Sequence, residues 1–120
     1  MGTTLELLQE AAVVLSQAGS VKERLAQAWL SHLAVLEPAQ LPEPFRAGFR
    51  EMAEAMRRER ALPRENPVLA SIRKMSNEEA SRYTALVIRV YAAAARLGTT
   101  TPLPRTPMLA PIVQLFAADA

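Results

Sequence analysis

Apolar side chains recur at helical spacing along most of the chain, and the widest apolar stripe lies in residues 76–98. Arg82, Arg89 and Arg96 form a polar ridge there that repeats every seventh residue. At 100° per residue, the apolar positions cover an arc of roughly 200°. They are Ala80, Tyr83, Thr84, Leu86, Val87, Ile88, Val90, Tyr91, Ala94, Ala95 and Leu97. One neighbour cannot bury so wide a stripe, so we expect a central helix that is buried on most of its sides.

The ends of the predicted helices carry capping residues. Ser76 followed by Glu79 predicts a capping box at the start of the central helix, and Ser20 with Glu23 predicts another. Gly98 supplies the residue type that commonly ends a helix.

Four further helices are expected before the central one. Thr3 or Thr4 caps the first, and Asn66 before a proline caps the fourth. Their predicted ranges are 5–17, 21–36, 44–60 and 67–74. The third has a narrow apolar stripe, which leaves little apolar surface for other segments to cover.

The last 22 residues divide into a proline-rich strap, residues 99–106, and an apolar tail that we expect to form a short helix. The candidate interaction residues of this tail are Met108, Leu109, Ile112, Val113, Leu115 and Phe116. Exposing six such side chains to water is unfavourable. The tail therefore packs on its own bundle or on a second copy, and we favour exchange in a homodimer.

These patterns predict an all-α fold: a small bundle of four to five helices with a C-terminal extended strap and a short helix. The helical domain spans residues 1–98, and residues 99–120 belong to the same domain or form a dimer contact. No stretch indicates a strand.

Between Ser20 and Leu97 three segments form a recognisable pattern: SVKERLAQAWLSHLAVL, LPEPFRAGFREM and VLASIRKMSNEEASRYTALVIRVY. The pattern resembles a group of short bacterial all-helical proteins of uncharacterised function. In that group a Ser-x-Lys-x-Arg-Leu opening precedes Leu-Pro…Phe, Ile-x-x-Met-Ser/Asp-x-Glu-Glu-Ala and a long helix. The matching positions are mostly caps and core residues, so the resemblance implies a fold and no activity.

Charge is unevenly distributed, although the net charge of the 120 residues is only +2. Residues 1–43 carry two basic and five acidic side chains, residues 44–74 carry eight and four, and residues 75–120 carry four and three. The basic middle region suggests candidate phosphate contacts: Arg57, Arg58, Arg60, Arg64, Arg73 and Lys74. Interleaved glutamates, and the lack of a nearby aromatic residue for base stacking, make nucleic acid the alternative partner rather than the first.

The chain offers little catalytic chemistry. It has no cysteine, which excludes thiol nucleophiles, cysteine-ligated zinc and iron–sulfur clusters. Its single histidine, His32, lies on an apolar face and is interpreted as structural. Glu79 is assigned to a cap, and Glu51 and Glu54 lie among arginines. We expect no enzyme activity, no metal and no cofactor.

The expected function is a non-catalytic protein-interaction or regulatory module. No apolar run approaches the ~20 residues that span a bilayer, and the first residues lack a basic leader. We therefore expect a cytoplasmic protein without membrane contact.

Overall fold

The computed structural model of the chain describes residues 3–60 and 63–98. This part is all-helical and contains no strand, which confirms the predicted helical bundle. The α-helices are α1 (Thr4–Leu15), α2 (Val21–Ala28), α3 (Arg46–Ala55), α4 (Pro67–Lys74) and α5 (Asn77–Gly98). Three shorter turns are η1 (Trp29–Leu33), η2 (Pro38–Gln40) and η3 (Glu43–Phe45). The strap and the six candidate tail residues lie outside the described residues.

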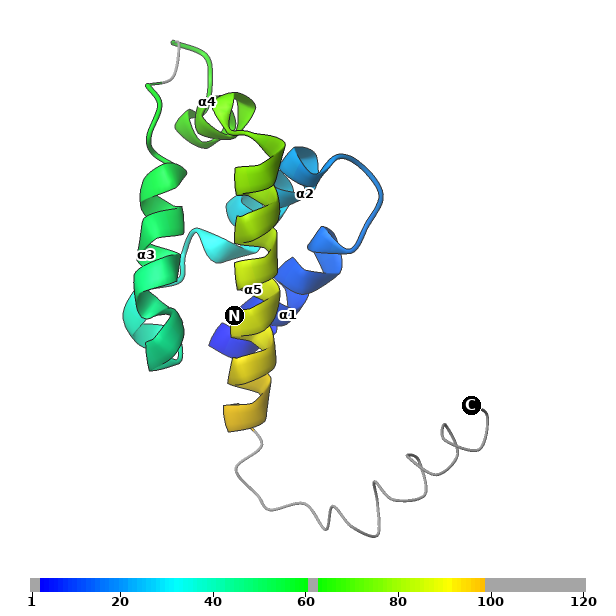
Figure 1. The fold of residues 1–120 in the computed structure, drawn as a ribbon, viewed down its shortest axis with the longest axis vertical. Coiled ribbons are helices and arrows are strands. Elements are labelled where there is room, and N and C mark those ends of the chain that lie inside the picture. Colours follow the sequence, from blue (N-terminus) through cyan, green and yellow to red (C-terminus); the bar gives the residue numbers. More distant parts are fainter. Residues whose placement is uncertain (1–2, 61–62, 99–120) are drawn as a thin grey trace, which may run out of the picture.

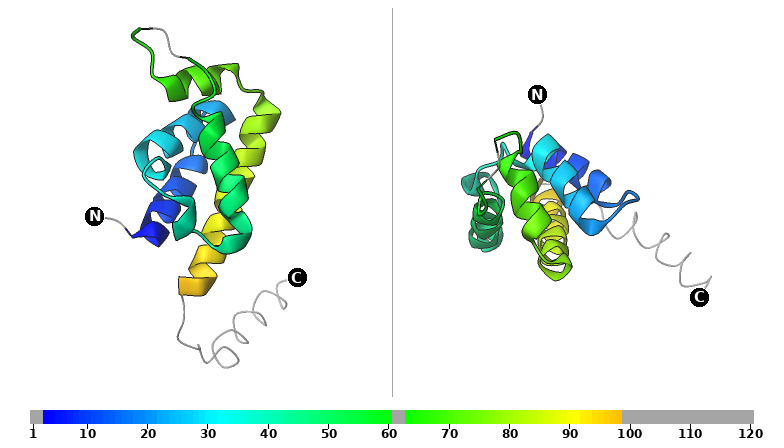
Figure 2. Two further views of the ribbon diagram at one scale, coloured as in Figure 1. Left: turned by 90° about the vertical axis from the view of Figure 1, so that its left-hand side faces the viewer. Right: turned by 90° about the horizontal axis from the view of Figure 1, so that it is seen from above.

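Helix α5 is the centre of the bundle. In Figures 1 and 2, α1 and α2 pack along one side of α5, and α3 lies on the other side. The residues of α5 that reach the core include Ala80, Tyr83, Val87 and Val90, all buried. They meet a core built from the other helices, including Leu8, Leu15, Leu25, Leu33, Phe49, Met52 and Met56.

Local capping was predictable. Four cap side chains each accept a hydrogen bond from a backbone amide of the helix that follows. At α1 and α2 the bonds run from the Glu6 amide to Thr3 Oγ1 (3.1 Å) and from the Glu23 amide to Ser20 Oγ (3.1 Å). At α4 and α5 they run from the Val68 amide to Asn66 Oδ1 (2.7 Å) and from the Glu79 amide to Ser76 Oγ (3.0 Å).

The predicted boxes at α2 and α5 are only half formed. The Glu23 carboxylate accepts from the Ser20 hydroxyl (3.1 Å) rather than from the Ser20 amide. The Glu79 carboxylate accepts from Arg58 and Tyr83 instead.

A π turn interrupts the second predicted helix, so the prediction of one continuous helix over 21–36 is wrong. The Ala34 amide donates to the Trp29 carbonyl five residues back (2.9 Å). A π turn holds one residue more than an α turn. Three large side chains in and just after this turn are buried: Trp29, Leu33 and Leu36.

The third helix is shorter than predicted. It begins at Arg46 rather than near residue 44, after the two turns η2 and η3, each of which contains a proline. It ends at Ala55 rather than at Arg60. Beyond it, the Glu59 amide donates to Ser71 Oγ (3.0 Å), so a contact with α4 takes the place of further helical bonds.

The uncovered side of α5 is wider than the sequence predicted. Val87 is 1% exposed, yet its neighbour Ile88 is 42% exposed. Leu97, in the last turn, is 64% exposed. The uncovered part of α5 therefore carries apolar surface as well as its arginines.

Candidate docking groove between α3 and α5

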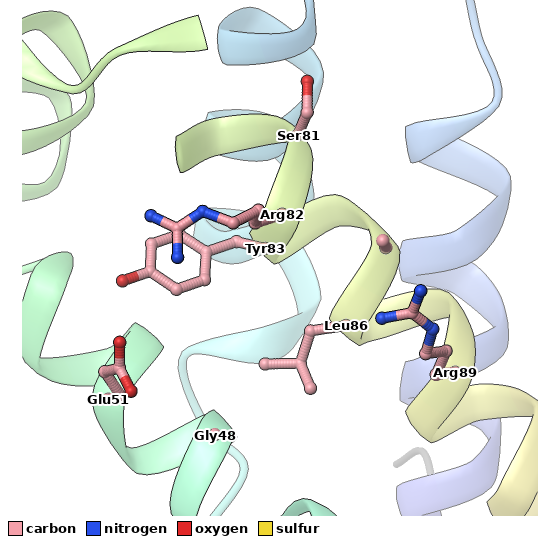
Figure 3. A pocket seen from close by; sticks show the side chains of 8 residues that line it. Gly48, Glu51, Ser81, Arg82, Tyr83, Leu86 and Arg89 are labelled. Atoms are coloured by element: carbon pink, nitrogen blue, oxygen red, sulfur yellow. The ribbon is translucent and has the colours of Figure 1, made fainter. Parts of the chain in front are cut away.

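An open groove of about 450 Å³ lies between α3 and α5. Helix α3 contributes Gly48 and Glu51, and α5 contributes Ser81, Arg82, Tyr83, Ala85, Leu86 and Arg89. Figure 3 shows Leu86 pointing from α5 toward Gly48, with Glu51 further along α3. The groove follows about two turns of α5.

Small residues leave this space open. Gly48 has no side chain, and Ser81 and Ala85 project little from α5. The two helices are in close contact at Leu86: a Cβ atom added at Gly48 would lie 3.3 Å from Leu86 Cδ1. A larger side chain at residue 48 would therefore crowd the floor of the groove.

Two arginines flank the apolar floor. Arg82 and Arg89 are exposed, and neither forms an ion pair within the described part of the chain. They are seven residues apart on α5, a separation of about 10 Å along the axis at 1.5 Å per residue. On the α3 wall the exposed Glu51 provides a negative charge.

Tyr83 and Glu79 close one end of the groove through a fixed network. The Tyr83 hydroxyl donates to Glu79 Oε2 (3.2 Å), and Arg58 Nη2 donates to the same oxygen (2.7 Å). The hydrogen bond from Arg58 holds the pKa of Glu79 below its ordinary value. Burial, with Glu79 nearby, raises the pKa of Tyr83. At neutral pH these two pKa shifts keep Glu79 ionised and Tyr83 protonated. The pair therefore acts as a structural network and does not transfer protons.

The six candidate phosphate contacts do not form one free basic surface. Arg58 pairs with Glu79, as above, and two more of the six also pair with acids. Arg73 Nη2 lies 3.1 Å from Glu65 Oε2, and Lys74 Nζ lies 3.2 Å from Glu59 Oε1. Three of the six positive charges are therefore offset locally by carboxylates.

The other three form no ion pair within the described part of the chain. Arg60 and Arg64 are exposed on either side of the undescribed residues 61–62. Arg57 lines a second hollow of about 580 Å³, beside Arg50 and Glu54. Trp29 and Phe49, with ring centroids 5.7 Å apart, form its floor. Both rings are almost fully buried.

His32 is half-buried within the π turn. Among the described residues, no group of three His, Cys, Asp or Glu side chains is placed to hold a metal ion.

Sequence reasoning interpreted the ridge of Arg82 and Arg89 as a solvated face and did not identify the groove. Two signals were present: arginines at seven-residue spacing, and a small residue, Ala85, between them. Neither signal shows that α3 places a glycine opposite Leu86.

No protein-family profile matches the chain, and no curated protein or solved structure matches it. In the part of the chain that is described, no helix is long and apolar enough to cross a membrane.

Proposed function

We propose that this chain is a non-catalytic protein-interaction module that docks a helix of its partner in the groove between α3 and α5. The observation that carries the proposal is the apolar floor that Ala85 and Leu86 form in the groove. Amphipathic helices bind by laying their apolar face into grooves of this kind. The open side of α5 provides such a face without any rearrangement of the core.

A groove-blocking variant tests this function. Ala85→Gln lengthens a half-buried side chain in the groove with a good helix former. Ala18→Gln makes the same change at an exposed loop position as a control. Proteins captured from an extract of the native host by the unmodified chain and by both variants are quantified by mass spectrometry, and melting temperatures are compared.

The proposal expects a partner that is retained by Ala18→Gln and lost with Ala85→Gln at an unchanged melting temperature. Capture that is unaffected by Ala85→Gln would reject the groove as the docking site.

The homodimer is a separate proposal. It rests on the apolar residues between Met108 and Phe116, which lie outside the described residues. Truncation after Gly98, followed by light scattering and a fluorescent dye that binds apolar surface, tests it. A dimer that becomes a monomer supports exchange of the tail, whereas a full-length monomer at high micromolar concentration rejects it.

The alternative, a nucleic-acid-associated protein, has weaker support. Arg58, Arg73 and Lys74 would have to leave carboxylate partners to contact phosphates. Binding to phosphates weakens steeply as salt is raised. A salt-dependent shift assay with duplex DNA and RNA tests this alternative directly.

A further inference from the structure

We propose that the partner helix is acidic, with Asp or Glu repeated every seventh residue along one edge of an apolar seam. This inference rests on the docking function proposed above and specifies the chemistry of the partner. It follows from the positions of Arg82 and Arg89 on either side of Ala85.

The arginines set the spacing. When two helices pack along each other, residues that are seven positions apart in one helix lie on the same side of that helix. A partner that runs along α5 therefore presents residues i and i+7 to Arg82 and Arg89 in turn. Carboxylates at these positions complement the exposed guanidinium groups.

The floor sets the seam. Along α5, Ala85 and Leu86 lie between the two arginines and form the apolar part of the groove. Small side chains let two helix backbones approach closely. An alanine- or leucine-rich seam on the partner matches this surface.

Glu51 restricts where the carboxylates of the partner can lie. It is exposed on the α3 wall, so it repels a carboxylate on that side. The carboxylates of the partner are therefore expected to contact the arginines of α5 and to avoid Glu51.

A second copy of α5 fits this surface poorly. In an antiparallel pair, residues at equivalent flanking positions face each other, so Arg89 and Arg82 of one helix would oppose those of the other. Like charges in such positions disfavour pairing. The charge pattern thus selects a different helix.

Two synthetic helical peptides of about three heptads test the inference. They share one alanine–leucine seam and differ only in carrying Glu or Lys at the flanking heptad position. Fluorescence anisotropy measures their binding to the full chain at low and moderate salt. The native chain is expected to bind the Glu peptide about tenfold more tightly than the Lys peptide at low salt, because two attractive pairs become repulsive.

Charge reversal provides the matched variants. Arg82→Glu with Arg89→Glu is expected to invert the preference in favour of the Lys peptide. Arg60→Glu with Arg64→Glu makes the same change in net charge at exposed positions away from the groove, and is expected to retain the preference for Glu. Circular dichroism and melting temperature verify that all variants fold.

Each remaining outcome overturns the acidic-helix inference. These outcomes are equal binding of both peptides, no binding of either at millimolar concentration, and an unchanged preference after reversal at Arg82 and Arg89. Tighter binding of a DNA or RNA duplex that is lost with the same reversal also overturns it, and assigns the arginines to phosphates. The capture experiment with Ala85→Gln tests the docking function separately. If capture depends on Ala85 but the two peptides bind equally, the groove is a docking site and its partner is not acidic.

Discussion

Arg58 donates to both carboxylate oxygens of Glu79, with Nη2 2.7 Å from Oε2 and Nη1 3.3 Å from Oε1. This bidentate pair joins the segment after α3 to the first turn of α5. Tyr83 adds a third donor to the same carboxylate. Because Tyr83 also lines the groove, the pair fixes one end of the docking surface.

Replacing this carboxylate changes how stability depends on pH. The pKa of Glu79 is lowered in the folded chain, chiefly by the hydrogen bond from Arg58. Because this pKa is lower in the folded chain than in the unfolded chain, the ionised carboxylate stabilises the fold. The stabilisation is complete above the ordinary pKa of 4.5 and is lost as pH falls through the pKa of the folded state. Arg58 is half exposed, so we expect Glu79→Gln to cost about 1 kcal/mol at neutral pH, the upper end for a surface pair.

Urea unfolding at a series of pH values measures this effect. The difference between native and Glu79→Gln should shrink below pH 4.5 and vanish once the native carboxyl is protonated. Glu78→Gln, at an exposed position in the same turn, is the control and should change stability less at every pH. A Glu79→Gln deficit that persists unchanged in acid would contradict the proposed role of the ion pair.

An introduced charge should reduce the free energy of unfolding by very different amounts at two adjacent residues of α5. Val87 is 1% exposed, so Val87→Asp places a carboxylate without a partner in the core and should cost more than about 3 kcal/mol or abolish cooperative unfolding. Ile88→Asp puts the same group on the exposed face and should cost less than about 1 kcal/mol, through a small loss of helix propensity and of partial burial. Thermal unfolding followed by circular dichroism compares the two, and similar losses would show that the outer face of α5 is covered.

The close approach of Gly48 to Leu86 is tested by a double-mutant cycle. Alanine favours a helix over glycine by about 1 kcal/mol, but its methyl group at residue 48 would lie 3.3 Å from Leu86 Cδ1. Gly48→Ala should therefore stabilise the Leu86→Ala variant by up to about 1 kcal/mol and the native chain by clearly less. Equal effects in the two backgrounds, measured by urea unfolding, would show that the two residues do not interact.

Thr84 carries a hydroxyl that the fold does not use. Its Oγ1 atom is buried and has no hydrogen-bond partner in the described part of the chain. Thr84→Val replaces the hydroxyl with a methyl group and should raise the free energy of unfolding by about 1 kcal/mol. Thr84→Ser keeps the hydroxyl, loses the methyl group, and should lower it. A loss of stability in Thr84→Val would reveal a partner for the oxygen.

Features that depend on neighbouring residues in the chain were predictable from the sequence. Ser20 and Asn66 cap α2 and α4 as expected, because a cap is a bond between residues two or three positions apart. The end of α3 was not predictable, since it depends on Ser71, twelve residues beyond Glu59.

The candidate site was predictable only in part. The seven-residue spacing of Arg82 and Arg89 was visible in the sequence, but the exposed side of α5 was not. Val87 and Ile88 are both apolar and adjacent, so composition cannot show which one faces the core. Their burial is decided by where α1, α2 and α3 pack.

The π turn has a consequence for how this chain can change in length. An ordinary α-helix ladder closes each bond across four residues, whereas η1 spans five between Trp29 and Ala34. The turn therefore accommodates one residue beyond what a regular helix would hold. Removing the exposed Ser31 should convert the turn to an α turn while Leu33 and Leu36 keep facing the interior. A single-residue deletion, which shifts the phase of an ordinary helix, would here restore it.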